Sequence, residues 1–96
     1  MNIIKDDIFT NSLKQILKYI SQDSKSRASK FNIQLSKKIS NIPNMPLKFR
    51  QSSYYEDEKI RDLVFKGYTI PYLVDIDKNV IIILDIFKWS YKKQIK

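Results

Sequence analysis

The sequence has 96 residues, of which 43% are hydrophobic and 12% aromatic, so residues 1–96 suit one small packed domain rather than a disordered chain. It contains no Cys and no His, which excludes disulfide frameworks, thiolate metal sites and the commonest general base near neutral pH. The formal net charge is +8. Such a charge favours nucleic acid, an acidic protein or an anionic surface as a partner, although a merely solvated Lys-rich surface gives the same balance.

The charge is concentrated in the first half of the chain. Residues 1–48 carry nine Lys and Arg against three acidic residues, whereas residues 49–96 carry nine against seven. The first residues lack the apolar core of a signal peptide, and the longest apolar run, Val80 to Leu84, is too short to span a bilayer. We therefore expect a cytoplasmic protein with no membrane partner, no metal and no cofactor, because no carboxylate spacing suggests a metal site.

Two amphipathic helices are predicted in the first half, after a short strand at Ile3-Ile4. Asp7 or Thr10 is expected to cap the first helix, and the polar segment 21–24 to separate the two helices. The second helix is expected to end before Pro43. Apolar residues recur at helical spacing in both segments: Phe9, Leu13, Ile16, Leu17 and Ile20 in the first, and Ala28, Phe31, Leu35, Ile39 and Ile42 in the second. The two stripes predict a helical hairpin that packs on another layer.

The second half reads as a three-stranded meander, because its period changes to two. Strands are expected on either side of the tight Lys66-Gly67 connection, and the apolar run Val80 to Leu84 suits a central strand. Pro71 donates no ladder hydrogen bond, so it predicts an edge position or a bulge. The complete order is an N-terminal strand, an α-helical hairpin and an antiparallel three-strand meander. This order predicts an α+β fold with the helix pair packed on a four-stranded sheet.

Several local patterns resemble the RelE/ParE superfamily of toxins from type II toxin–antitoxin systems. The apolar and aromatic spacing from Phe9 to Ile20 is similar to the first helix of that family. The segment from Arg61 to Asp75 resembles its hairpin, with an Arg, a Gly-Tyr and a second Tyr four residues later, and Ile81 to Lys88 is similar to its last strand. The resemblance implies the same α+β layout and a cognate antitoxin that wraps the toxin.

The superfamily divides by mechanism, and the resemblance leaves the two mechanisms to be weighed. RelE-like members cut mRNA on the ribosome, whereas ParE-like members poison DNA gyrase. RNA cleavage without a metal needs a base, cations that hold the phosphorane charge and an acid for the leaving oxygen. The resemblance places these catalytic roles on Arg61, Lys88 and Tyr91. However, Lys88-Trp89-Ser90-Tyr91 stands where such nucleases carry an Arg or His, so whether the chain is an enzyme stays open.

Five further residues are candidates for contacts with a target protein or with RNA. In the irregular segment after Pro46, Arg50, Tyr54 and Tyr55 are interpreted as an aromatic and basic surface. In the tail, Trp89 is interpreted as a residue that stacks on a base. Each of these interpretations has a structural alternative. The loop residues can simply pack within the loop, and the Trp can pack in the core. Arg61 can form an ion pair with Asp62, Asp75 or Asp85. The candidates are Arg50, Tyr54, Tyr55, Lys66 and Trp89.

The sequence thus favours a growth-inhibiting toxin that binds a protein target such as DNA gyrase and is neutralised by a cognate antitoxin. A ribosome-dependent mRNA endonuclease that uses Arg61, Lys66, Lys88 and Tyr91 is the first alternative. A non-toxic nucleic-acid-binding module of the same fold is the second alternative, which the net charge of +8 also suits.

Overall fold

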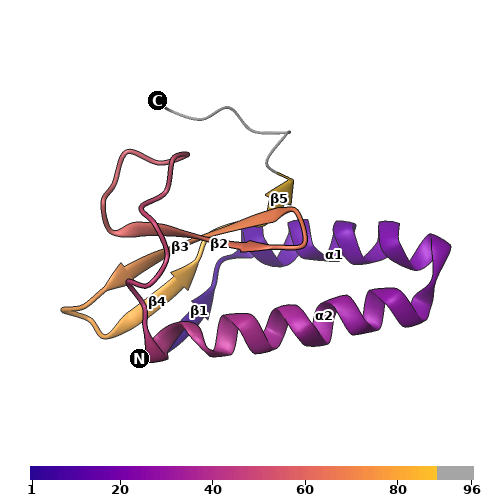
Figure 1. The fold of residues 1–96 in the computed structure, drawn as a ribbon, viewed down its shortest axis with the longest axis horizontal. Helices are drawn as coiled ribbons and strands as arrows, with labels where there is room; N and C mark the ends of the chain where they lie inside the picture. Colours follow the sequence, from indigo (N-terminus) through magenta and orange to yellow (C-terminus); the bar gives the residue numbers. More distant parts are fainter. Residues whose placement is uncertain (89–96) are drawn as a thin grey trace.

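The computed structural model describes residues 1–88 and has two helices packed on a mixed sheet (Figure 1). In the described residues, one strand precedes the two helices, and the other strands follow them. The elements are β1 (Asn2–Lys5), α1 (Asp7–Asp23), α2 (Lys25–Ser40), the short 3₁₀ helix η1 (Ile42–Asn44), β2 (Ile60–Phe65), β3 (Tyr68–Asp75), β4 (Val80–Ile83) and β5 (Phe87–Lys88). The predicted α+β fold and the order of its elements are confirmed.

The sheet has the strand order β1-β4-β3-β2, and the short β5 pairs with β3. Strands β2, β3 and β4 form the predicted antiparallel meander, while β1 lies parallel to β4. The run from Val80 is therefore an interior strand, as its apolar residues on both faces predicted. The resemblance placed one last strand from Ile81 to Lys88, whereas the structure divides this segment into β4 and the two-residue β5, which adds a fifth strand to the expected four.

Pro71 lies on the interior strand β3, opposite a bulge in the strand beside it. Pairing between β3 and β4 ends at Tyr72 and Ile83, and pairing with β5 starts at Thr69 and Phe87. Three residues, 84–86, thus oppose only two, 70–71, which defines a bulge. The edge position expected for Pro71 is wrong, and the bulge is confirmed. It turns the chain after β4 towards α1.

The connection between β2 and β3 is a two-residue hairpin turn. Lys66 has φ 49° and Gly67 has φ 83°, and Phe65 pairs directly with Tyr68. Two consecutive positive φ angles define the type I′ turn, whose twist matches that of the flanking strands. The predicted tight turn is confirmed, and it holds Lys66 at the tip of the hairpin in a left-handed conformation that few side chains adopt.

The two helices are capped by residues just before them. The carboxylate of Asp6 accepts a hydrogen bond from the Ile8 amide at 2.9 Å, so Asp6 is the N-cap of α1, and the prediction of Asp7 or Thr10 is wrong. Asp6 has the extended backbone of an N-cap, whereas Asp7 and Thr10 already lie within the helix. Ser24 caps α2 by accepting from the Arg27 amide at 3.1 Å.

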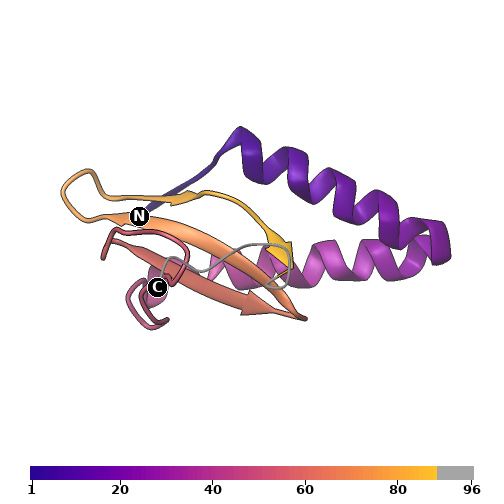
Figure 2. The same ribbon diagram turned by 90° about the horizontal axis from the view of Figure 1, so that it is seen from above.

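The helices differ in how completely they are buried. All five residues of the second predicted stripe are buried, and four of them, Phe31, Leu35, Ile39 and Ile42, join the core formed with the sheet. In α1 only Phe9 is buried, while the rest of the first stripe is half-buried: Leu13, Ile16, Leu17 and Ile20. Both helices extend beyond the β2–β3 turn (Figure 2). Within residues 1–88, the apolar face of α1 is therefore only partly covered.

Candidate partner-binding site

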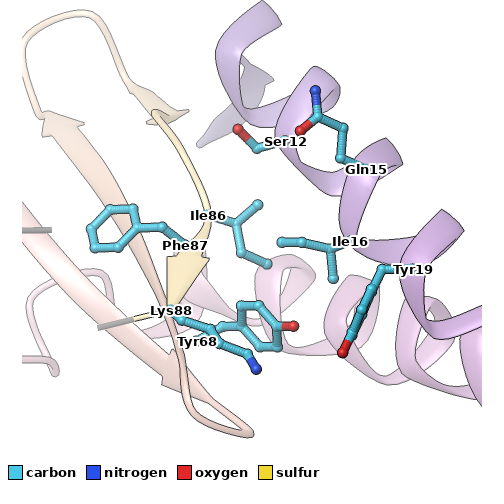
Figure 3. Close-up of a pocket in the computed structure, with 8 residues that line it drawn as sticks. All are labelled: Ser12, Gln15, Ile16, Tyr19, Tyr68, Ile86, Phe87 and Lys88. Carbon is cyan, nitrogen blue, oxygen red and sulfur yellow. The ribbon is translucent and has the colours of Figure 1, made fainter. Parts of the chain in front are cut away.

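A groove of about 370 Å³ lies between α1 and the strands β3 and β5; we call it the α1–β5 groove. Its walls come from three segments that are distant in the sequence (Figure 3). The lining residues are Ser12, Gln15, Ile16 and Tyr19 of α1, Tyr68 of β3, and Ile86, Phe87 and Lys88. Apolar side chains form most of this surface, and a phenol and an ammonium group border it, as is typical of a site for a peptide or a small ligand.

The bulge and the helical repeat of α1 bring these side chains together. Ile16 and Tyr19 are three residues apart and so share one face of α1. Ile86 is the last residue of the bulge and points towards Ile16, whereas the ring of Phe87 turns away from α1 (Figure 3). The Lys88 ammonium lies 5.8 Å from the centre of the Tyr68 ring, within reach of a cation–π contact. The groove therefore presents an apolar base with one cation at its border.

A second groove, of about 220 Å³, lies on the other side of Tyr68; we call it the basic groove. It is formed where the β2–β3 turn meets the two helices. Its lining residues are Ile20, Arg27, Lys30, Phe31, Lys66 and Tyr68. Lys66, a binding candidate from the sequence, is thus grouped with two cations of α2 that the sequence did not single out. Arg27 and Lys30 are one helical turn apart on α2, and this spacing was the only feature of the sequence that could have indicated a shared site.

Arg61 and Lys88, the described candidates for catalysis, lie at different ends of the sheet. Arg61 pairs with Tyr72 and Lys88 pairs with Tyr68, four residues away along β3, a separation of about 13 Å. The guanidinium of Arg61 donates to the backbone carbonyl of Phe49 at 3.1 Å, which ties the loop before β2 to the sheet. The two cations thus pair with opposite ends of this part of β3, and the Arg61 guanidinium already has a backbone partner. Tyr91 and Trp89 lie outside the described residues.

The candidates of the irregular segment are held against the sheet to different degrees. Arg50 is exposed, whereas Tyr54 and Tyr55 are half-buried. The ring of Tyr54 packs edge-on against Phe87, with 5.0 Å between ring centres. Burial raises the pKa of Tyr55, and three aspartate carboxylates raise it further, namely those of Asp85, Asp62 and Asp6. This environment favours loop packing over an open aromatic surface for these two tyrosines.

Two buried carboxylates position the loops around the sheet, and the sequence did not single them out for this role. Asp62 is 2% exposed and accepts a hydrogen bond from the Ser53 amide at 3.4 Å. Asp85 accepts from the Ser12 hydroxyl at 3.0 Å and from the Ile86 amide at 2.7 Å. Asp85 thereby joins the bulge to α1 and fixes one end of the α1–β5 groove. Within residues 1–88, no group of three or more acidic side chains is placed to hold a metal ion.

Comparison with known proteins identifies the family. A family model described as the ParE toxin of the type II toxin–antitoxin system parDE matches residues 3–90. The chain belongs to this ParE toxin family. A solved structure titled "Chromosomal ParDE TA system from P. aeruginosa" is similar to it with a TM-score of 0.75 and 18% sequence identity, over 92% of this chain and 95% of that chain. That likeness shows a shared fold. The sequence matches no curated protein.

Membership of the ParE family confirms the resemblance to the RelE/ParE superfamily. A toxin of a type II system has a protein antitoxin as its cognate partner. Two residues of the half-buried stripe of α1 line the grooves that share Tyr68: Ile16 lines the α1–β5 groove, and Ile20 lines the basic groove. Among the described residues, no helix is long and apolar enough to cross a membrane.

Proposed function

We propose that this ParE is the growth-inhibiting toxin of its module and acts in the cytoplasm by binding a protein target such as DNA gyrase. The observation that carries the proposal is the separation of Arg61 from Lys88 along β3, together with the tie between Arg61 and the Phe49 carbonyl. Because the Arg61 guanidinium already donates a hydrogen bond to the loop, it is less able to bind a phosphate. Metal-free RNA cleavage needs its cations, base and acid around one phosphate.

We further propose that the cognate antitoxin covers the apolar stripe of α1 and fills the α1–β5 groove. A helix that leaves four apolar side chains half-buried, Leu13, Ile16, Leu17 and Ile20, gains burial from a partner. The net charge of +8 favours an acidic partner by speeding its encounter with the toxin. An apolar segment with acidic flanks suits both features.

RelE-like mRNA cleavage on the ribosome is the second candidate, and one observation favours it. The Lys88 ammonium lies 5.8 Å from the centre of the Tyr68 ring, and Lys66 lines the basic groove together with Tyr68, so both cations border the groove surface that this phenol shares. A non-toxic nucleic-acid-binding module receives less support, because Tyr54 and Tyr55 are packed against the sheet and offer little open ring surface for stacking.

The test is induced expression in bacteria, followed by separate measurements of translation, the DNA damage response and gyrase-dependent DNA cleavage. Binding to gyrase predicts a damage response before translation falls. The double variant Lys88→Ala, Tyr91→Phe divides the mechanisms further. If the protein cuts RNA, each lost catalytic contact costs about 10²-fold or more in rate, so toxicity disappears. If it binds a protein target, toxicity falls only in part, because few residues dominate an interface. Ribosome-dependent mRNA cleavage that the double variant abolishes contradicts the proposal.

A further inference from the structure

The basic groove gathers three cations from two parts of the chain that are far apart in sequence. Arg27 and Lys30 lie three residues apart on α2, so they share one face of that helix, and Lys66 reaches the same groove from the β2–β3 turn. On the other side of Tyr68, Lys88 adds a fourth cation. No acidic residue is among the described residues that line either groove.

The fold itself fixes where these charges lie. Lys66 occupies the first position of the type I′ turn with φ 49°, and its ammonium lies 5.5 Å from the centre of the Phe65 ring. Below it, the ring of Phe31 packs between those of Phe65 and Tyr68, at centre-to-centre distances of 5.3 and 5.5 Å. The three cations are exposed and border a base of packed aromatic rings.

Like charges held around one groove repel one another, and an anionic partner relieves this repulsion. Carboxylates and phosphates both bind such cations through charge-assisted hydrogen bonds, so the charges alone suit an acidic peptide and a nucleic-acid backbone equally. Phe31 is 5% exposed and Tyr68 is 8% exposed, so neither offers an open face on which a base can stack. The mainly apolar groove beside the cations suits the side chains of a peptide better than a phosphate backbone.

Tyr68 lines both grooves, so the basic groove adjoins the α1–β5 groove at that residue. A single peptide segment that follows α1 therefore meets apolar side chains first and cations next. We propose that the basic groove binds acidic side chains of the antitoxin, next in its chain to the apolar residues that fill the α1–β5 groove. This inference rests on the proposed antitoxin contact and adds to it the chemistry of the partner.

The experiment compares two triple variants that each remove three positive charges. The groove variant is Arg27→Gln, Lys30→Gln, Lys66→Gln. The control is Lys25→Gln, Lys37→Gln, Lys38→Gln, three exposed positions of α2 outside both grooves. Association and dissociation rates with the full-length cognate antitoxin are measured at low and high salt. A single-stranded RNA oligonucleotide is the competitor, and thermal unfolding confirms that each variant is folded.

Both variants lose the same net charge, so we expect association to slow about equally in the two, because steering depends on the overall field. Dissociation is expected to quicken about tenfold or more in the groove variant alone, because only that variant loses contacts in the complex. Equal dissociation rates in the two variants overturn the inference, as does displacement of the antitoxin by RNA. A groove variant that binds antitoxin normally but loses toxicity also overturns it, since the groove then serves the target. Failure of the wild-type protein to bind antitoxin contradicts the proposed antitoxin contact itself.

Discussion

The two helices of the hairpin have similar lengths and similar apolar spacing, yet they differ in what covers them. In α2 the whole stripe is buried, and Leu35, at 1% exposed, lies in the core against the sheet. In α1 the stripe is buried at Phe9 and only half-buried beyond it, and Tyr19 beside it is 66% exposed. Within the described residues, the apolar stripe of α2 is buried and much of the stripe of α1 keeps some exposure to solvent.

This difference assigns separate tasks to the two helices. Burial of α2 stabilises the fold, because apolar area removed from water is the main favourable contribution to folding. The half-buried face of α1 contributes less to folding and keeps apolar area available for association. The bulge at residues 84–86 extends the same surface by directing β5 towards α1.

The largest expected effect on stability is that of Leu35→Ala. Truncation of a fully buried Leu costs about 2–5 kcal/mol of unfolding free energy, because apolar contacts are lost and a cavity remains. Leu17→Ala makes the same chemical change in the half-buried stripe of α1, and we expect less than half that cost. Denaturant unfolding of the two variants measures both values. Equal losses would show that α1 is packed as tightly as α2.

The largest expected effect on binding is that of Tyr19→Ala. Tyr19 lines the α1–β5 groove and is exposed, so its loss should change stability by less than about 0.5 kcal/mol. Tyrosines are frequent among dominant interface residues, so antitoxin affinity should fall about tenfold or more. Ile33→Ala is the control, because Ile33 is 54% exposed on α2 and lines neither groove. Comparable affinity losses in the two variants would remove the distinction between the helices.

A smaller effect is expected at Tyr72, on the well-packed side of the molecule. Its hydroxyl donates to the Pro46 carbonyl at 2.8 Å, so Tyr72→Phe should cost about 1 kcal/mol. Burial raises the pKa of Tyr72 from 10.0 to about 12. Between these two pKa values the unfolded chain loses the phenol proton before the folded chain does. The stability that Tyr72 contributes as a neutral phenol is therefore complete below pH 10 and declines as the pH rises towards 12.

This prediction is tested by measuring the free energy of unfolding of the wild type and of Tyr72→Phe as the pH is raised from 9 to about 12. Every other titratable group is the same in both proteins, so the difference between them isolates Tyr72. The wild type should lose stability more steeply. Parallel curves would show that the phenol is as solvated in the folded protein as in the unfolded chain.

The sequence predicted the elements whose form depends on local pattern. The stripe of α2, the Lys66-Gly67 turn and the interior position of β4 all follow from spacing and turn chemistry, and the structure confirms them. The stripe of α1 predicted a helix correctly, but spacing cannot show how much of a helix the sheet will cover. Its N-cap was placed one or more residues late for a similar reason, because several adjacent polar residues are suited to capping.

The candidate site was less predictable because it depends on contacts between distant segments. Arg61 looked suited to bind phosphate, and only the tertiary structure shows it holding the Phe49 carbonyl. Pro71 indicated a bulge, but which residues form it, and that Ile86 then lies opposite α1, depends on the register between β3 and its neighbours, which the sequence pattern does not specify. The basic groove likewise joins Lys66 to α2 across more than thirty residues of sequence.

Amide hydrogen exchange across the two helices, in the free toxin and in its complex with the antitoxin, tests the central claim most directly. Helices with little buried apolar surface open locally more often, so free α1 should exchange faster than free α2. Antitoxin binding should slow exchange throughout α1, most strongly around Ile16 and Tyr19, and should change the core-facing part of α2 little. If exchange in α1 is the same in both states, α1 is not the surface that this ParE presents to its antitoxin.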